Sequence, residues 1–206
     1  MFEKGPHVSF SNCSLPYHLS GIVEEADDLV LMSPELFKKQ YNIDARVDSE
    51  VIEINREQKY VVVKNSISGE NYTETYDKLI LSPGASPIVP KIPGIEHVNV
   101  FTIRNVVDID KLKKFLNQTS TKDVAVIGGG FIGVEVAENL SLASYNVTLI
   151  EGTNQLLRPF DYDMVQIFHK EIMDHGVDLI VEDTVAKFEE DTVVLSSGKK
   201  VHAKTV

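Results

Sequence analysis

The hydrophobic pattern of the chain changes near its middle. Between residues 43 and 82, short runs of alternating apolar and polar positions are separated by polar turns, which predicts a small antiparallel meander. From residue 107 onward, continuous apolar runs alternate with stretches of helical periodicity, a pattern typical of strands buried in a parallel sheet. The predicted elements of this second half are helices over 107–117, over 131–143 and from 161, strands from 124, over 147–150 and over 177–181, and a hairpin over 192–203. This order predicts an α/β fold.

Capping residues predict where individual helices begin and end. Ser33 precedes Pro34, so a short helix is expected to start there with Ser33 as its N-cap. Asp161 is a candidate N-cap for the helix that follows it, and Gly176 is a candidate residue just past its end. Four apolar residues of that helix share one face and are expected to lie in the core, namely Met164, Ile167, Phe168 and Ile172.

A glycine-rich turn joins the strand at Val124 to the next helix. It carries Gly128, Gly130 and Gly133 in the spacing G-x-G-x-x-G. Between a strand and a helix, the first glycine permits the tight turn, the second lets backbone approach a pyrophosphate, and the third lets helix and strand pack closely. The free N–H groups at the helix start also favour a diphosphate. The turn therefore predicts a dinucleotide site, and a turn that serves packing alone is the alternative.

Glu151 follows the strand over 147–150, where such a site carries its acidic residue. Its carboxylate can accept hydrogen bonds from a ribose hydroxyl and would repel a 2′-phosphate, so NADH is predicted in preference to NADPH. Arg158 could in principle favour NADPH, but it is expected to lie in a loop beyond the strand end.

Composition and charge exclude several classes of protein. Of the 206 residues, 43% are hydrophobic and 25% are charged, which is ordinary for a globular protein. The net charge is −11 and no basic tract offsets it, which argues against nucleic acid as a partner. No apolar run is long enough to span a bilayer, and the N-terminus lacks the apolar region of a signal peptide. We therefore expect a cytoplasmic protein that has no membrane partner.

Cys13 is the only cysteine, which rules out an intrachain disulfide and a zinc site built on several thiolates. The six histidines show no metal-ligand spacing, so no metal site is predicted. Pro16 and Gly21 suggest a short helix that starts near the cysteine. A thiol at a helix N-terminus carries more thiolate than a free thiol. The residues alone leave open an inert, buried cysteine.

Both ends of the chain look unfinished. Glu3 is similar to Glu151, because it reads as a carboxylate that closes the second strand of a nucleotide-binding unit, yet no glycine-rich loop precedes it. At the other end, the α/β unit stops after its hairpin. We therefore expect two incomplete Rossmann-like units and a small antiparallel meander.

Four motifs carry a resemblance to a known family. They are SFSNCSLPY at residues 9–17, YDKLILSPGASP at 76–87, FTIRN at 101–105 and GGGFIGVEVAENL at 128–140. In this order they resemble the single-cysteine group of flavin-dependent pyridine-nucleotide disulfide oxidoreductases, and within it the coenzyme A-disulfide reductases. The resemblance implies a flavoprotein with two dinucleotide-binding domains. Residues 1–106 would be a partial FAD-binding domain with the redox cysteine and the meander, and residues 107–206 an incomplete NAD-binding domain.

The resemblance also implies a role for particular residues. Cys13 would be the redox nucleophile, with Ser9 and Asn12 beside the substrate and the flavin. Glu3 would bind the adenosine ribose of FAD, and the backbone of Val51 would contact its adenine end. The other implied contacts are Ser82, Pro83, Gly84 and Ala85 for the flavin cofactor, and Gly128, Gly130, Phe131, Ile132, Gly133, Glu135 and Glu151 for NADH. Among these, Phe131 would be an aromatic gate over the flavin ring and Glu135 would help to place the nicotinamide.

The implied reaction passes electrons from NADH through FAD to a disulfide between Cys13 and CoA, in a full-length enzyme expected to be a homodimer. Lys38 and Lys39 stand where relatives often carry basic residues for the CoA phosphate, whereas Gln40 is neutral. The substrate would be CoA disulfide or a related persulfide or polysulfide. One alternative is an NADH oxidase or peroxidase of the same fold, in which the cysteine passes through sulfenic acid. Another is a nucleotide-binding fragment with no activity of its own, which the absence of an FAD glycine loop favours.

Overall fold

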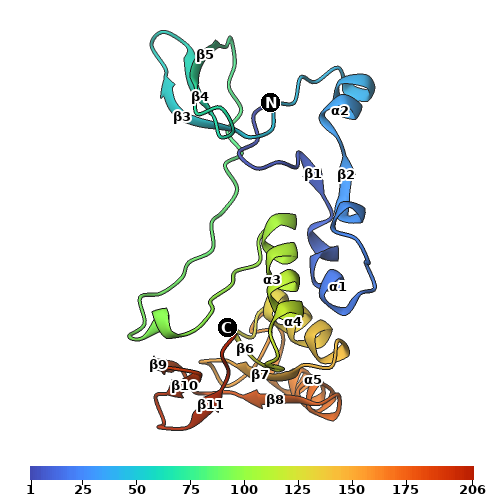
Figure 1. Cartoon of the computed structure of the whole chain (residues 1–206), viewed down its shortest axis with the longest axis vertical. Helices are drawn as coiled ribbons and strands as arrows, with labels where there is room; N and C mark the ends of the chain where they lie inside the picture. The colour runs from blue at the N-terminus through green and yellow to red at the C-terminus, as the bar shows by residue number, and fades with distance from the viewer. The chain divides into compact units, whose positions relative to one another are not determined.

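The structure is a computed structural model that describes all 206 residues. The chain forms two compact units (Figure 1). The first comprises Met1–Ser11 and Asp27–Ser86, and the second comprises Asn12–Ala26 and Pro87–Val206. The expected division at residues 106 and 107 follows nucleotide-binding roles and stays a prediction. By internal contacts, the cysteine segment groups with the C-terminal residues instead.

The first unit is built from a strand pair, a short helix and a three-stranded sheet. Its elements are β1 (Ser9–Phe10), η2 (Ala26–Leu29), β2 (Val30–Met32), α2 (Pro34–Tyr41), β3 (Ser49–Asn55), β4 (Tyr60–Asn65) and β5 (Asn71–Thr75). Helix α2 begins as predicted, because the Ser33 side chain accepts a hydrogen bond from the Leu36 amide at 3.3 Å.

The sheet of the first unit is the predicted antiparallel meander, in the order β3-β4-β5. Val61 and Val63 of the central strand are buried, as a strand with neighbours on both sides should be. The outer strand β3 differs, since its Val51, Ile52 and Ile54 are all exposed. A register shift between Val51 and Glu53 interrupts the pairing of β3 with β4.

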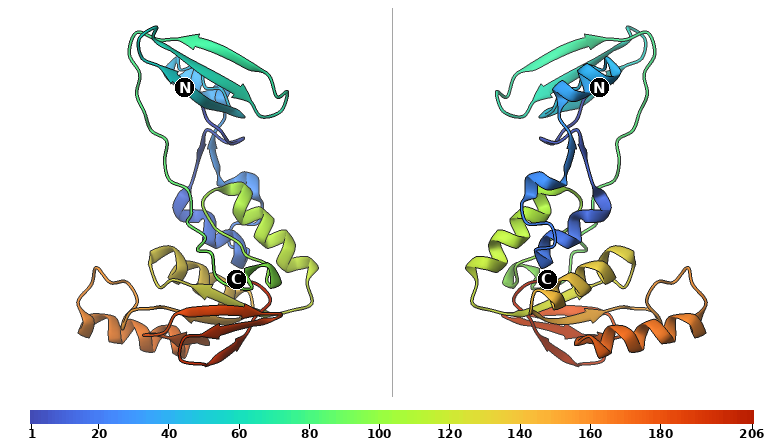
Figure 2. Two further views of the ribbon diagram at one scale, coloured as in Figure 1. Left: turned by 90° about the vertical axis from the view of Figure 1, so that its left-hand side faces the viewer. Right: turned by 90° about the vertical axis from the view of Figure 1, so that its right-hand side faces the viewer.

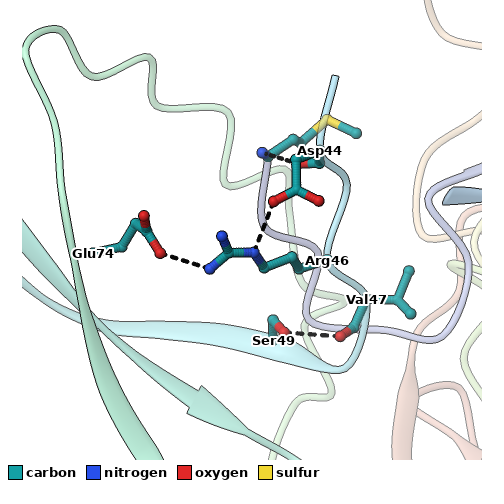
Figure 3. Close-up of polar contacts among 6 residues, drawn as sticks. Asp44, Arg46, Val47, Ser49 and Glu74 are labelled. Carbon is teal, nitrogen blue, oxygen red and sulfur yellow. Dashed lines mark hydrogen bonds and ion pairs between the residues drawn. The ribbon is translucent and has the colours of Figure 1, made fainter. Parts of the chain in front are cut away.

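Arg46 ties the meander to the start of the chain within this unit (Figure 3). Its Nη1 lies 2.6 Å from Glu74 Oε2, and its Nε lies 3.1 Å from Asp44 Oδ2. The guanidinium also lies over the rings of Phe2 and Tyr72, at 5.5 and 5.8 Å from their centroids. Hydrogen bonding to Tyr72, and then to Glu74, raises the pKa of Arg46 above its ordinary value. The backbone of Arg46 pairs in parallel with Phe2 through an isolated bridge, so the side chain and the backbone of Arg46 both hold the start of the chain.

The second unit is an α/β layer followed by a second meander. Its elements are η1 (Asn12–Ser14), α1 (Leu15–Ser20), η3 (Ile95–His97), α3 (Val106–Gln118), β6 (Asp123–Ile127), α4 (Phe131–Leu142), β7 (Asn146–Ile150), α5 (Tyr162–Asp174), β8 (Val177–Ile180), β9 (Val185–Glu189), β10 (Thr192–Leu195) and β11 (Lys200–His202). Strands β6, β7 and β8 form a parallel sheet in that order, and β9 to β11 form an antiparallel sheet in the order β11-β10-β9. The predicted Rossmann-like α/β fold is confirmed.

The two sheets of the second unit lie next to each other (Figure 2), and one hydrophobic core joins them. The parallel sheet contributes Ala125, Ile150 and Ile180, and the meander contributes Phe188 and Val193 among others. Helix α4 contacts all three parallel strands. The sheet is therefore covered on both faces, which explains the continuous apolar runs in the sequence.

The predicted core face of α5 is wrong by about one residue. Of the four predicted residues, Ile172 is buried and Phe168 is half-buried, but Met164 and Ile167 are exposed at 61% and 69%. Val165 and His169 are buried in their place. The buried face includes a histidine whose ring nitrogen is satisfied by a backbone N–H, and apolar periodicity alone does not count such a residue as core.

Helix ends and one strand also differ from expectation. Asp161 does precede α5, but its side chain makes no capping hydrogen bond. In a different helix, α3, Asn105 is a side-chain N-cap, since its Oδ1 accepts from the Asp108 amide at 3.0 Å. Gly176 follows α5 at φ +83°, as predicted for a residue past the helix end. Strand β9 was not expected, and it makes the predicted hairpin a three-stranded sheet.

Candidate nucleotide and thiol site

The glycine-rich turn leads directly from β6 into α4. Gly128 has φ +105°, a conformation that favours glycine, and its N–H donates to Ile150 O of β7 at 2.8 Å. A Cβ built on Gly133 would lie 1.9 Å from Gly128 O, so any larger residue there would collide with backbone. A Cβ on Gly130 would meet nothing within 4 Å. The turn is therefore tightly packed at Gly133, whereas the space next to Gly130 is open.

The start of α4 offers unoccupied backbone donors. Gly130 is the N-cap and has no side chain to satisfy the first amides, and no acidic residue lies in the first turn. Phe131 and Ile132 of this turn are exposed at 55% and 61%. An anion would be stabilised here by the amides and by the helix dipole.

Glu151 directly follows β7 and lies beside the turn. Its Oε2 accepts from Gly129 N at 2.7 Å, and its Oε1 accepts from Thr153 N and Thr153 Oγ1, both at 2.8 Å. Partial burial is the largest influence and opposes ionisation, but these hydrogen bonds and the charge of Arg158 together outweigh it and lower the pKa of Glu151. The group is therefore a carboxylate at neutral pH. It has lone pairs left for further donors.

Residues 152–160, called here the 152–160 loop, fold back onto the glycine turn. Leu157 N donates to Gly129 O at 2.8 Å. The Leu156 side chain is fully buried. It packs so closely on Gly129 that a Cβ built on Gly129 would lie 2.2 Å from Leu156 Cδ2. At the far end of the loop, the Phe160 ring contacts the Phe131 ring edge-on at 6.0 Å between centroids. The sequence placed Arg158 in a loop, and this loop is packed against the turn rather than extended away from it.

Cys13 lies in η1, immediately before α1, and its thiol is exposed. The alternative hypothesis of an inert, buried cysteine is therefore wrong about the burial of Cys13. Helix α1 packs against α3 and α4. Asn12 Oδ1 accepts from Arg104 Nη1 at 3.4 Å, so a second expected site residue is held beside the cysteine.

A buried amide connects the cysteine helix to the nucleotide helix. Asn139 of α4 is fully buried, and its Oδ1 accepts from Ser20 Oγ at 2.7 Å while its Nδ2 donates to Glu135 O at 2.8 Å. Cys13 and the glycine turn thus belong to one packed arrangement within the second unit. Ser9 lies on β1 in the first unit, and its expected place beside the cysteine stays a prediction.

Glu3 in the first unit shares part of the hydrogen bonding of Glu151, namely its backbone bonds and the bond from the amide two residues further on. Glu3 N donates to Arg46 O at 2.9 Å, and its Oε1 accepts from Gly5 N at 2.7 Å. Asp48 N then donates to Gly5 O at 3.0 Å, with Asp48 at φ +50°. A three-stranded meander follows at Ser49.

The second unit repeats this arrangement residue for residue. Glu151 N donates to Ile180 O at 2.8 Å, and Glu182 N donates to Thr153 O at 2.8 Å, with Glu182 at φ +57°. A three-stranded meander again follows, beginning with β9. The two acids therefore lie at equivalent places in the backbone hydrogen bonding of the two units, which supports the expected role of Glu3 at a second nucleotide.

The other expected flavin contacts lie in the first unit. Val51 is on the exposed strand β3, and Ser82, Pro83, Gly84 and Ala85 form an exposed segment near the end of that unit, with Gly84 at φ +69°. Their roles stay predictions. Lys38 and Lys39 lie on α2 and line a shallow hollow together with Glu35 and Asp44.

The structure holds no group of three or more histidine, cysteine or carboxylate side chains arranged to bind a metal ion. None of its helices has both the length and the apolar character needed to cross a membrane.

Sequence reasoning missed three residues that shape this site. Leu156 and His169 were not singled out, because an apolar residue in a loop and a lone histidine in a helix carry no motif. Asn139 was part of a quoted motif without a role of its own. The one sequence signal that could have indicated Asn139 and His169 is a polar residue on the face of an amphipathic helix that is expected to be buried, because a buried polar group needs a hydrogen-bond partner.

The whole chain, residues 1–206, matches the model of the pyridine nucleotide-disulphide oxidoreductase family. The chain belongs to this family. A coenzyme A disulfide reductase of Staphylococcus haemolyticus is 34% identical to it over 198 residues, which cover 96% of this chain and 44% of the relative.

Two solved structures are also similar to the chain. The reduced CoADR-RHD of Bacillus anthracis is 44% identical with a TM-score of 0.96, and the match covers all of this chain and 37% of that one. The water-forming NADH oxidase of Lactobacillus brevis, bound to NADH, is 31% identical with a TM-score of 0.89 over 99% of this chain and 46% of that one. The chain thus spans less than half the length of these relatives.

Proposed function

We propose that this chain is the part of an FAD-dependent NADH:disulfide oxidoreductase that carries the redox cysteine and the NADH site. The substrate is CoA disulfide, or a related persulfide or polysulfide. The observation that carries the proposal is that the exposed Cys13 directly precedes α1, and that α1 packs against α4, the helix that begins at the glycine turn. Similarity to coenzyme A disulfide reductases supports the substrate class.

The second unit fits a dinucleotide. The open space before Gly130 leaves room for a pyrophosphate, and the free amides of the first turn of α4 would donate to it. Glu151 would accept from the adenosine ribose hydroxyls, which favours NADH over NADPH. When bound, the nicotinamide supplies a hydride. Phe131, exposed at the first turn, would cover the reacting side, and Glu135 one turn later would orient the ring.

Glu3 supports FAD as the second cofactor. Its carboxylate accepts from the amide two residues further on, as that of Glu151 does, and would be placed to accept from a ribose. Val51 and the segment Ser82 to Ala85 are the further residues of the first unit that would contact FAD, which supplies two-electron transfer to a disulfide when bound.

Cys13 performs the thiol chemistry. Its thiolate attacks one sulfur of CoA disulfide, the sulfur–sulfur bond breaks, and one CoA leaves as a thiolate. The product is a mixed disulfide between Cys13 and the second CoA. Two electrons from NADH, with a proton, then release this CoA and restore the Cys13 thiolate. Exposure of Cys13 allows a large thiol substrate to reach it.

A second candidate function is an NADH oxidase, which the similarity to the Lactobacillus brevis enzyme favours. In that reaction Cys13 would pass through a sulfenic acid. Consumption of NADH by the full-length enzyme with CoA disulfide, oxygen or peroxide as the sole acceptor separates the two. We expect CoA disulfide to be reduced far faster than oxygen or peroxide, and a faster reaction with oxygen would contradict the proposal.

A further inference from the structure

His169 is a buried histidine with a single defined task. It lies on α5, is 6% exposed, and its Nε2 accepts the Leu156 N–H at 3.0 Å. Both residues are buried, so this bond is shielded from water. Neither residue has a role in the proposed reaction.

The peptide held by His169 is the one that supports the glycine turn. Leu156 packs its side chain on Gly129, and the next amide, Leu157 N, donates to Gly129 O. Leu157 has φ +47°, a conformation that non-glycine residues rarely adopt and that its surroundings must maintain. Gly129 is therefore fixed at its nitrogen by Glu151 and at its oxygen by the 152–160 loop.

We propose that His169 is a positioning residue of the dinucleotide site: its neutral ring anchors the 152–160 loop against Gly129, and protonation of the ring releases that anchor and weakens dinucleotide binding. This inference rests on the proposed function for the identity of the ligand.

The protonation state follows from the geometry. A ring that accepts at Nε2 carries its proton on Nδ1, and a doubly protonated ring cannot accept at all. Burial alone lowers the pKa of His169, so the ring is neutral at pH 7 and above. Burial is the one cause of this shift, to which Arg158 of the loop, Glu151 before it, and Asp163 and Lys170 of the same helix make no contribution.

The direction of the pH effect follows. Binding that requires the neutral ring is fully present above the ordinary histidine pKa of about 6.5 and is lost as the pH falls through the lowered pKa of His169. The limiting slope for one proton is about tenfold in affinity per pH unit. Glu151 does not titrate in this range, because its own pKa is lowered from 4.5.

Two substitutions of His169 distinguish its role as a hydrogen-bond acceptor for the loop from the effect of its protonation. His169→Gln places an amide oxygen at the reach of Nε2 and does not titrate, so it should keep the affinity for NAD⁺ at pH 8 and abolish its decline in acid. His169→Leu removes the acceptor and should weaken NAD⁺ binding at least about tenfold at every pH, as expected when a buried N–H loses its partner. His175→Gln is the matched control, since this exposed histidine directly follows α5 and its Nδ1 pairs with Glu171 of that helix.

The test is calorimetric titration of the purified proteins with NAD⁺ between pH 5.5 and 8, with circular dichroism to confirm folding. A decline in acid for the wild type and His175→Gln, but not for His169→Gln, supports the proposal. An unchanged decline in His169→Gln, or wild-type affinity in His169→Leu, overturns it.

A second measurement does not depend on the nucleotide. Hydrogen-exchange protection of the Leu156 and Leu157 amides, relative to intrinsic exchange, should fall in acid in the wild type and stay constant in His169→Gln. Equal behaviour of the two proteins overturns the proposal. Absence of NAD⁺ binding by the wild type at pH 8 would instead overturn the dinucleotide assignment, and the exchange data would still decide the role of His169.

Discussion

At the scale of the residue, Glu151 links the nucleotide site to cofactor choice. Its carboxylate holds the Gly129 amide and the Thr153 amide, and Arg158 lies close enough to contribute to its lowered pKa. A negative group at this position opposes a second negative group on the ribose. Arg158 is the cation that would favour a 2′-phosphate, but in this structure its charge interacts with the Glu151 carboxylate.

We predict that the wild-type enzyme uses NADH better than NADPH and that Glu151→Ala reverses or removes this preference. Loss of a repulsion worth roughly 1.4 kcal/mol changes the ratio of kcat/KM for the two cofactors about tenfold. Arg158 should add to the gain once the carboxylate is gone. The measurement is kcat/KM for both cofactors in the full-length enzyme.

Glu151→Ala combined with Arg158→Ala is the control for that experiment. The double variant should lose much of the gain for NADPH. Equal use of both cofactors by the wild type would contradict the assignment of Glu151.

The sequence predicted this residue because a fixed distance separates it from the glycine turn. It could not predict that the carboxylate is tied to Gly129, since that contact depends on the loop after the strand. His169 and Leu156 were missed for the same reason, because their contact joins α5 to a loop with no motif.

At the scale of the element, two glycines of the turn between β6 and α4 have different tasks, one in nucleotide binding and the other in the stability of the fold. Gly130 faces open space, whereas Gly133 faces the backbone of Gly128.

We predict that Gly130→Ala leaves the fold intact, at a cost below about 1 kcal/mol, and lowers NAD⁺ affinity at least about tenfold, because the added methyl group occupies the space of the pyrophosphate. Gly133→Ala should instead destabilise the protein by about 1–3 kcal/mol, since helix and strand must move apart. Thermal unfolding and NAD⁺ titration of both variants check this. Wild-type affinity in Gly130→Ala would be inconsistent with a nucleotide at this turn.

The helix caps allow a second paired prediction. Asn105→Ala should destabilise the second unit by about 1 kcal/mol, because it removes the acceptor for the Asp108 amide. Asp161→Ala should cost about 0.5 kcal/mol or less, since Asp161 makes no capping bond. Chemical denaturation of the two variants measures both values, and equal losses would contradict the difference in capping.

Strong periodicity and turn chemistry were sufficient to predict most elements. Ser33 marked the start of α2, Gly176 marked the end of α5, and apolar runs marked β6, β7 and β8. The core face of α5 could not be predicted, because Val165 and His169 replace Met164 and Ile167 only once the helix meets its neighbours. Strand β9 was missed because its Lys187 and Glu189 give it a polar surface.

At the scale of the whole molecule, the two units repeat one local plan. Each has an acid whose amide donates to a backbone carbonyl later in the chain, a residue in the left-handed conformation two positions after that carbonyl, and a three-stranded meander. Only the second unit carries a glycine-rich turn within residues 1–206. The similarity of Glu3 to Glu151 was predicted from the sequence, whereas its hydrogen bonds required the structure.

We predict that residues 1–206, purified as such, bind NAD⁺ but hold little or no FAD and do not reduce CoA disulfide with NADH. The reason is that FAD binding in this architecture needs a second glycine-rich loop to receive the pyrophosphate. An absorbance spectrum of the purified chain measures this directly. A stoichiometric flavin spectrum would contradict the prediction.

The central claim is that Cys13 reduces a disulfide with electrons from NADH. The most direct measurement is anaerobic NADH consumption by the full-length enzyme with CoA disulfide, for the wild type and for Cys13→Ser. The wild type should oxidise one NADH for each CoA disulfide reduced, and Cys13→Ser should show no reduction of the disulfide while it still binds NADH with unchanged affinity. Reduction of CoA disulfide by Cys13→Ser at the wild-type rate would contradict the account.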